Sequence, residues 1–370
     1  MSTAQLKVVT IVGTRPEIIR LSRVIPALDR HCAHVLVHTG QNYDPLLSDV
    51  FFSELGVRAP DVHLGISGAG FAAQIGELIA KIGDVFARER PDRVLILGDT
   101  NSGLAAIVAA RMGIPVYHME AGNRCYDDRV PEEINRRVID HSSAVLMPYT
   151  ERSKENLVRE GIERERIFIT GNPIHEVLTA YADRVDASDA LSRFGVETKR
   201  YFLLTMHRAE NVDEPARLRR LVDAVVGVSA AHDLPVLFSV HPRTADKLRQ
   251  AGLTPDPARV RLLEPLGFFD FVRLEREAGA VLSDSGTVQE ECAIFRVPNV
   301  TIRDVTERPE TLECGSNILS GAEPDAVARA MRLVLAQPAD WQPPTEYVAT
   351  GVTRTVVKLV LGRLSQRRHV

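Results

Sequence analysis

The stretch Val8-Val9-Thr10-Ile11-Val12-Gly13-Thr14-Arg15, near the start of the 370-residue chain, is a short β-branched run that stops at a glycine and an arginine. Its apolar residues are nearly continuous, which is typical of a parallel strand covered on both faces. Runs of the same kind follow at 35–38, 94–97, 116–119, 144–147, 167–169, 201–205, 236–240, 260–263, 280–282 and 300–302. The sequence therefore predicts eleven short, buried strands.

Helical periodicity fills the intervals between these runs. In 72–86, Ile75, Leu78, Ile79 and Ile82 recur at the spacing of one helix face, and 217–231 shows the same period. Strand and helix alternating along the whole chain indicate doubly wound α/β sheets with right-handed crossovers.

The chain is long enough for two domains, and eleven strands are many for one open sheet. A long interval without a strand signal lies between 170 and 201, and it opens with the turn Gly171-Asn172-Pro173. We therefore expect a Rossmann-like domain at 1–173 and a second at 174–352. A last helical stretch within 353–370 is expected to pack back on the first domain.

Composition excludes several classes of protein. Lys and Arg number 45 against 49 Asp and Glu, so there is no basic excess to hold a nucleic acid or an anionic membrane. The four cysteines form no CxxC pair, which disfavours a zinc cage and a disulfide framework. The N-terminus lacks a signal-peptide pattern, and no apolar run reaches the roughly 20 residues that cross a bilayer. A reduced, cytoplasmic protein is expected.

Polar groups gather where the predicted strands end. Ligands of open α/β sheets bind beyond the carboxyl ends of the strands, so these positions are the ones that form a site, expected in a cleft between the domains. Each group alone is more often a helix cap, a turn or a solvated charge, and the repetition is what favours function. The groups are Gly13-Thr14-Arg15-Pro16-Glu17, Gly98-Asp99-Thr100, Glu120-Ala121-Gly122, His207-Arg208, His241-Pro242-Arg243 and Asp284-Ser285-Gly286.

Ser285 and Gly286 precede the helical run 288–295, and a helix start of this kind binds phosphate through its N–H groups and its dipole. A carboxylate one turn later, in Gln289-Glu290-Glu291, is placed to accept from ribose hydroxyls. Arg15 and Arg308 are candidates to clamp a diphosphate. No G-x-G-x-x-G motif is present, which counts against a nicotinamide or flavin cofactor.

Carboxylates form the second candidate group. Asp99 and Glu120 each end a strand, and Glu132 and Glu133 stand in the first turn of a helix that starts at Pro131. Without the spacing of metal ligands, three convergent carboxylates favour proton transfer over metal chemistry. Their crowding is expected to raise the pKa of one of them toward neutrality.

At these residues the chain resembles the non-hydrolysing UDP-N-acetylglucosamine 2-epimerases over nearly its whole length. The motifs that carry the resemblance are Gly13-Thr14-Arg15-Pro16-Glu17, Gly98-Asp99-Thr100, Glu120-Ala121-Gly122-Asn123-Arg124, Pro131-Glu132-Glu133-Ile134-Asn135-Arg136, Thr170-Gly171-Asn172, His207-Arg208, Asp284-Ser285-Gly286, Gln289-Glu290-Glu291 and Thr306-Glu307-Arg308-Pro309-Glu310. The resemblance implies a fold like that of the GT-B glycosyltransferases, a homodimer, and no cofactor.

The resemblance also implies roles for single residues. Elimination of UDP to a 2-acetamidoglucal and its re-addition invert C2 of a UDP-2-acetamido sugar, and the two faces of C2 need two proton-transfer groups. The acid and base candidates are Asp99, Glu120 and Glu132, with His207 assisting departure of UDP. The substrate-binding candidates are Arg15, Arg20, His241, Phe271, Ser285, Gly286, Glu291 and Arg308.

Alternatives remain open on the substrate and on the reaction. The family commonly carries Lys where this chain has Arg20, and the segment 123–131 looks more like relatives that epimerise modified UDP-sugars for capsule or O-antigen. UDP-GlcNAc to UDP-ManNAc for surface polysaccharide is the first expectation, and a modified UDP-sugar is the second. Two functions of other classes also remain open: a GT-B glycosyltransferase and a non-catalytic nucleotide-sugar sensor.

Overall fold

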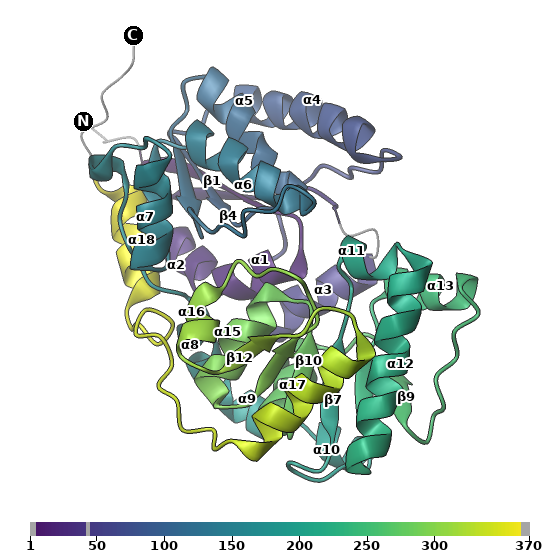
Figure 1. Ribbon diagram of the computed structural model, residues 1–370. Helices are drawn as coiled ribbons and strands as arrows, with labels where there is room; N and C mark the ends of the chain where they lie inside the picture. The colour runs from purple at the N-terminus through teal and green to yellow at the C-terminus, as the bar shows by residue number, and fades with distance from the viewer. Residues whose placement is uncertain (1–4, 42–44, 364–370) are drawn as a thin grey trace. The chain divides into compact units, whose positions relative to one another are not determined.

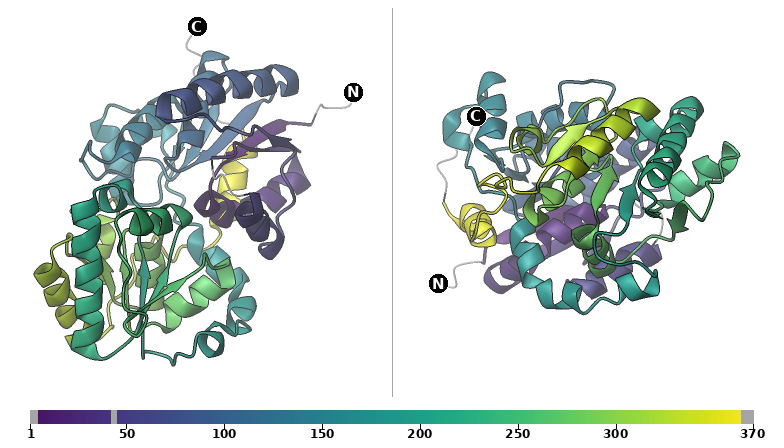
Figure 2. Two further views of the ribbon diagram at one scale, coloured as in Figure 1. Left: turned by 90° about the vertical axis from the view of Figure 1, so that its right-hand side faces the viewer. Right: turned by 60° about the horizontal axis from the view of Figure 1, so that its bottom comes forward.

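The computed structural model describes residues 5–41 and 45–363, and the chain divides into two compact units (Figures 1 and 2). The first unit extends to Thr179 and takes up the chain again from Glu346, and the second runs from Ala180 to Thr345. The chain leaves the first unit near the end of helix α8 (Ile174–Ala180), just beyond the expected boundary at 173.

The sheet of the first unit has six parallel strands in the order β3-β2-β1-β4-β5-β6. The central strand β1 pairs with β2 on one side and β4 on the other, so the chain reverses its winding direction at β1. The strands are β1 (Lys7–Val12), β2 (Ala33–His38), β3 (Val62–His63), β4 (Arg93–Leu97), β5 (Val116–Met119) and β6 (Val145–Met147).

The sheet of the second unit has six parallel strands in the order β12-β11-β10-β7-β8-β9. Counted from its own first strand, this is the same order as in the first unit, with β7 and β10 at the switch point. The strands are β7 (Phe202–Thr205), β8 (Val236–Ser239), β9 (Val260–Leu263), β10 (Ala280–Ser283), β11 (Asn299–Thr301) and β12 (Asn317–Leu319). The expected fold class, two Rossmann-like doubly wound domains, is confirmed.

Helices α4 (Phe71–Glu89), α5 (Ala105–Arg111) and α6 (Pro131–Ser142) cover one face of the first sheet (Figure 1). Leu78 and Ile82 of α4 pack with Val9 and Ile11 of β1 in one buried cluster, which is why the period of 72–86 marked a helix. The other helices of this unit are α1 (Arg15–Leu21), α2 (Val24–His31), α3 (Pro45–Glu54), α7 (Glu151–Arg159), α8 and α18 (Val352–Leu361).

Both faces of the second sheet are covered, because alternate residues of β7 belong to different cores. Phe202 and Leu204 pack with α12 (Pro215–His232) and α17 (Pro324–Ala336), and Leu203 packs with α14 (Phe268–Glu277) and α15 (Gly286–Phe295). The remaining helices are α9 (Ala182–Asp186), α10 (Ala190–Arg193), α11 (Ala209–Val212), α13 (Pro242–Gln250) and α16 (Pro309–Glu313).

The strand expected at 167–169 is wrong. Only Ile167 makes a single parallel bridge, to Leu146, at the outer edge beyond β6. Strands β3 and β12, at sheet edges and only two and three residues long, were not predicted from the sequence. Such strands are too short to show a period, since one or two apolar residues are not distinguishable from a loop.

The chain returns from the second unit to the first, where helix α18 packs against α2. Residues 364–370 of the predicted last helix lie outside the described residues. Within the described part of the chain, no helix is both long and apolar enough to cross a membrane.

Candidate functional site

In the first unit, the turn after β1 is closed by a buried carboxylate. Glu17 accepts from the backbone N–H groups of Gly13 at 2.5 Å and Thr14 at 2.8 Å, and the hydroxyl of Thr100 donates to it at 2.6 Å. Burial raises the pKa of Glu17 from 4.5 to about 7, against the lowering effect of these hydrogen bonds. Glu17, which was not among the three candidate carboxylates, thus has a pKa near neutrality.

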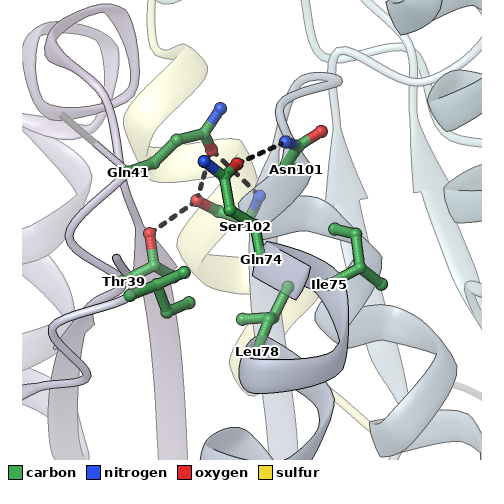
Figure 3. Close-up of a pocket in the computed structure, with 8 residues that line it drawn as sticks. Thr39, Gln41, Gln74, Ile75, Leu78, Asn101 and Ser102 are labelled. Atoms are coloured by element: carbon green, nitrogen blue, oxygen red, sulfur yellow. Dashed lines mark hydrogen bonds between the residues drawn. The ribbon is translucent and has the colours of Figure 1, made fainter. Parts of the chain in front are cut away.

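Gly13 allows the close approach of two neighbouring strand ends. A Cβ atom at this position would lie 2.0 Å from the Ser102 hydroxyl and 2.3 Å from the Thr39 hydroxyl. Ser102 and Thr39 hydrogen-bond at 2.7 Å, and Gln41 accepts from the Ser102 hydroxyl at 3.0 Å (Figure 3). These polar groups, with Gln74, line a small pocket that the sequence analysis did not anticipate.

Arg20 and Glu120 form a buried ion pair. The guanidinium of Arg20, on α1, binds Oε2 of Glu120, which directly follows β5, and their side chains are 3% and 8% exposed. The hydroxyl of Tyr149 donates to the same oxygen at 3.3 Å, and its ring lies 5.7 Å from the Arg20 guanidinium carbon. Arg15, at the start of α1, is half-buried, with its guanidinium carbon 5.5 Å from the ring of Phe51.

The backbone at Glu120 is itself unusual. Its φ of 64° lies in the left-handed region, which costs a non-glycine residue of the order of 1 kcal/mol or more. Gly122, at φ 80°, passes so close to α7 that a Cβ would lie 2.2 Å from the carbonyl oxygen of Ser153. Asn123 then donates to Glu120 at 3.3 Å and accepts from the Ser153 hydroxyl at 2.8 Å. The loop after β5 therefore holds the Glu120 carboxylate in one defined position.

Asp99, after β4, is joined to the start of α6. Arg136 donates to Oδ2 of Asp99 at 2.8 Å and to Glu133 at 2.8 Å, and Asn135 donates to the Asp99 carbonyl at 3.0 Å. Asp99 keeps a 20% exposed side chain beside the buried Arg136. The structure thus brings Asp99 next to Asn135 and Arg136 of α6.

The structure separates the two glutamates of α6. Glu133 is fully buried and accepts from the backbone N–H groups of Cys125 at 3.0 Å and Tyr126 at 3.1 Å. Burial raises its pKa, but those hydrogen bonds and the charge of Arg136 outweigh burial and hold the pKa below 4.5. Glu132 is half-exposed. Glu133 is therefore a buried structural anion, whereas Glu132 keeps exposed surface.

A buried network missed by the sequence analysis lies beneath these groups. Asp140 is fully buried and hydrogen-bonds His118 at 2.8 Å and Arg124 at 2.8 Å, while the other ring nitrogen of His118 contacts the Gly98 carbonyl at 2.9 Å. Burial raises the pKa of Asp140, but His118 and Arg124 lower it below its ordinary value. The network ties the ends of β4 and β5 to α6, which fixes the positions of Asp99 and Glu120.

In the second unit, Asp284 organises the loop after β7. Its fully buried carboxylate accepts from the backbone N–H groups of His207 and Arg208, and it lies 3.3 Å from Nδ1 of His207. The His207 side chain is 39% exposed. The His241 ring, at the N-cap of α13, is centred 6.2 Å from that of His207. Asp284 therefore lies beside Nδ1 of His207 and helps to orient the ring.

The start of α15 is built as expected around Ser285 and Gly286, with one difference. Ser285 occupies the N-cap position, but its hydroxyl bonds Thr287 at 2.9 Å and makes no capping hydrogen bond within the described structure. Gly286 is required by a close contact, because a Cβ there would lie 2.6 Å from the Glu307 carboxylate. Glu307 in turn is paired with Arg303 at 2.8 Å.

Arg308 and Glu291 are both nearly buried near the start of α15. The Arg308 guanidinium binds Glu290, and the two side chains are 5% and 0% exposed. Glu291 is 5% exposed on α15, and Phe271 is half-buried on the neighbouring α14. The candidate site residues divide between the two units. The second unit contains Phe271, Ser285, Gly286, Glu291, Arg308, His207 and His241, and the first contains Arg15, Arg20, Asp99, Glu120 and Glu132.

The supporting residues were missed because they are defined by partners far away in the sequence. Glu17 and Asp284 stand inside quoted motifs, so their strand-end position was a signal that could have found them. Tyr149 also lies just after a strand, β6, so its strand-end position was a signal of the same kind. Asp140 and His118 carry no such signal, since they lie within a helix and a strand.

Comparison with known proteins gives one family. Residues 26–360 match the sequence profile described as UDP-N-acetylglucosamine 2-epimerase. A UDP-N-acetylglucosamine 2-epimerase of Methanocaldococcus jannaschii is 40% identical over 347 residues, which cover 92% of this chain and 95% of that protein. A UDP-2,3-diacetamido-2,3-dideoxy-D-glucuronate 2-epimerase of Pseudomonas aeruginosa is 38% identical over 340 residues, covering 90% of this chain and 93% of that protein.

The structure of the M. jannaschii UDP-GlcNAc 2-epimerase, solved in complex with UDP-GlcNAc and UDP, is similar to this one. Its TM-score is 0.91 at 38% sequence identity, and the match covers 96% of this chain and 99% of that chain.

Proposed function

This chain belongs to the non-hydrolysing UDP-N-acetylglucosamine 2-epimerase family, and from that premise we propose that it interconverts UDP-GlcNAc and UDP-ManNAc. It is an isomerase that acts at C2 of a UDP-sugar. The observation that carries the proposal is the set of carboxylates at the ends of β4 and β5 and the start of α6, held in place by Arg20, Arg136 and Asp140.

The reaction we propose is elimination and re-addition of UDP. The C2 hydrogen of an N-acetylhexosamine has no adjacent carbonyl, so its direct removal near neutral pH is slow. A base takes the C2 proton, the C–H electron pair forms the C1–C2 double bond, and the C1–O bond breaks to release UDP. For return, the UDP oxygen attacks C1 and C2 receives a proton on its other face.

In this scheme Asp99, Glu120 and Glu132 are the proton-transfer candidates. Asp99 and Glu132 keep exposed surface, whereas Glu120 is held by Arg20 and is the most restricted of the three. His207, oriented by Asp284, donates through Nε2 to the departing diphosphate. Arg15, Ser285, Gly286 and Arg308 hold the diphosphate, with Arg20 and His241 as further binding candidates, while Glu291 holds the ribose and Phe271 lines the uracil pocket.

A second substrate is supported by the comparisons. The P. aeruginosa relative, named for a diacetamido uronate, is 38% identical, close to the 40% of the M. jannaschii relative. A modified UDP-sugar for surface polysaccharide is therefore the second candidate.

Proton NMR in deuterated buffer tests the function. With UDP-GlcNAc and no acceptor, we expect the C2 proton signal to disappear while a manno isomer grows, and a panel of UDP-2-acetamido sugars identifies the preferred one. Absence of exchange with every sugar of the panel overturns the proposal. Release of UDP only with an acceptor indicates a glycosyltransferase, and accumulation of free ManNAc with UDP indicates a hydrolysing enzyme.

We also propose a homodimer. Phe71 and Ile79 on α4 and Met112 after α5 are 59%, 41% and 45% exposed, and α4 contacts α5, so these two helices offer large apolar side chains to a second copy of the chain. Light scattering is expected to give twice the mass of one chain, and a monomer at all concentrations contradicts it.

A further inference from the structure

Helices α14 and α15 meet at two buried carboxyl groups. Glu275, on α14, is 0% exposed, and Glu291, on α15, is 5% exposed. Their side chains hydrogen-bond to one another. Two carboxylates offer only acceptors, so this contact requires that one of them carries a proton.

The surroundings place that proton on Glu275. Its Oε1 accepts from the Cys292 thiol at 3.8 Å, and among the described residues no group donates to its Oε2. An oxygen that lacks a donor in a buried site is satisfied when it carries the proton and donates. Burial first, and the charge of Glu291 second, raise the pKa of Glu275 well above 4.5.

Glu275 is not one of the residues that the resemblance singled out, and it lies behind Glu291 on the neighbouring helix. We propose that Glu275 is a positioning residue for nucleotide binding, whose protonated carboxyl donates to Glu291 and fixes that carboxylate for the two ribose hydroxyls. This rests on the proposed function, which gives Glu291 the ribose. The donated hydrogen bond occupies one side of Glu291 and leaves its charge for the 2′ and 3′ hydroxyls.

Two variants of nearly equal volume separate positioning from packing. In Glu275→Gln, the amide oxygen accepts from Cys292 and the amide nitrogen donates to Glu291, so the contact is preserved. In Glu275→Met, the length is kept but no donor remains. The readout is the ratio of affinities for UDP and 2′-deoxy-UDP, measured by calorimetry, because only the ribose contact differs between these two ligands.

We expect wild type and Glu275→Gln to prefer UDP by about ten-fold or more, as for a hydrogen bond to a charged group. Glu275→Met is expected to bind both nucleotides alike. An undiminished preference in Glu275→Met overturns the inference. If wild type binds UDP without any preference, Glu291 does not hold the ribose and the inference fails with that assignment, while absence of UDP binding by wild type contradicts the proposed function itself.

The pH dependence of the preference for UDP over 2′-deoxy-UDP tests the proposal even if Glu275→Met does not fold. The titratable groups that interact with Glu275 are Glu291 and Cys292 of α15 and Tyr201 before β7. As pH rises through the raised pKa of Glu275, Glu275 loses the proton it donates, and the preference for UDP declines. Glu275→Gln has no proton to lose, so its preference stays constant; a parallel decline in both proteins overturns the inference.

Discussion

Arg20 and Glu120, one hundred positions apart in the sequence, form a buried ion pair between α1 and the end of β5. The left-handed backbone at Glu120 and the contact of Arg20 with Tyr149 restrict both partners. A buried carboxylate fixed in this way depends on its cation, so the position of Glu120 requires Arg20.

We predict that Arg20→Met destabilises the protein by about 3–5 kcal/mol, because it leaves the Glu120 charge buried and unpaired. Arg20→Lys keeps a positive charge and is expected to retain part of both stability and turnover. Urea unfolding and turnover of the two variants check this. Tyr149→Phe is the control, since it removes only the 3.3 Å hydrogen bond, and a loss as large as that of Arg20→Met would show that the ion pair is not the main support.

Asp99→Asn combined with Glu120→Gln is predicted to lower turnover by at least about 10²-fold, since each change removes a proton-transfer group. UDP affinity is expected to change little, because the candidate UDP-binding residues other than Arg15 and Arg20 lie in the second unit. Turnover with UDP-GlcNAc and UDP calorimetry measure the two effects. Full activity of the double variant would contradict the assignment of these carboxylates.

Glu17 gives the protein a pH-dependent stability. Its pKa is about 7 in the folded chain against 4.5 ordinarily, so between these values the folded state binds a proton that the unfolded state has released. The free energy of unfolding therefore falls as pH rises from 4.5 to 7, by up to roughly 3 kcal/mol.

The variant Glu17→Gln isolates this contribution of Glu17 to the pH dependence of stability. Its amide can accept from Gly13 and donate to Thr100. We expect wild type to lose stability relative to this variant between pH 4.5 and 7, in urea unfolding at several pH values. A difference that is constant over this range would show that Glu17 keeps an ordinary pKa.

Much of this architecture could be predicted from the sequence because parallel strands and their ends are local features. The run at Val8–Val12 is nearly all apolar, and a glycine follows it where the chain must turn. The strand, the turn and the position of the candidate site at the end of the strand could therefore all be predicted. The edge strand at Val62–His63 was not, since two residues carry no period.

The supporting contacts of the site could not be predicted, because they depend on tertiary packing. Glu132 and Glu133 are adjacent and chemically identical, and both favour a helix start. Only the approach of Cys125 and Tyr126 to α6 buries one of them and leaves the other half-exposed. The partnership of Glu275 with Glu291 was hidden in the same way, since it depends on how α14 packs on α15.

The two glutamates of α6 make a matched test. Glu132→Gln is predicted to reduce turnover by about 10²-fold or more with little loss of stability. Glu133→Gln is predicted to cost about 1–3 kcal/mol at pH 7, because it removes a buried anion that two backbone N–H groups and Arg136 require. Since the pKa of Glu133 is lowered, this cost shrinks as pH falls below 4.5. If Glu133→Gln loses turnover at unchanged stability, the roles are reversed.

Arg308 tests the diphosphate site. Arg308→Ala is predicted to weaken UDP binding by about ten-fold or more, because it removes a guanidinium from beside the start of α15. It also leaves Glu290 buried without its partner, so lost affinity could reflect lost structure. Glu290→Gln is the control, since its amide oxygen still accepts from Arg308 while the positive charge beside the ligand is kept. Calorimetry with UDP should then show near wild-type affinity for Glu290→Gln and weak binding for Arg308→Ala. Equal affinity in Arg308→Ala and wild type would place the diphosphate elsewhere.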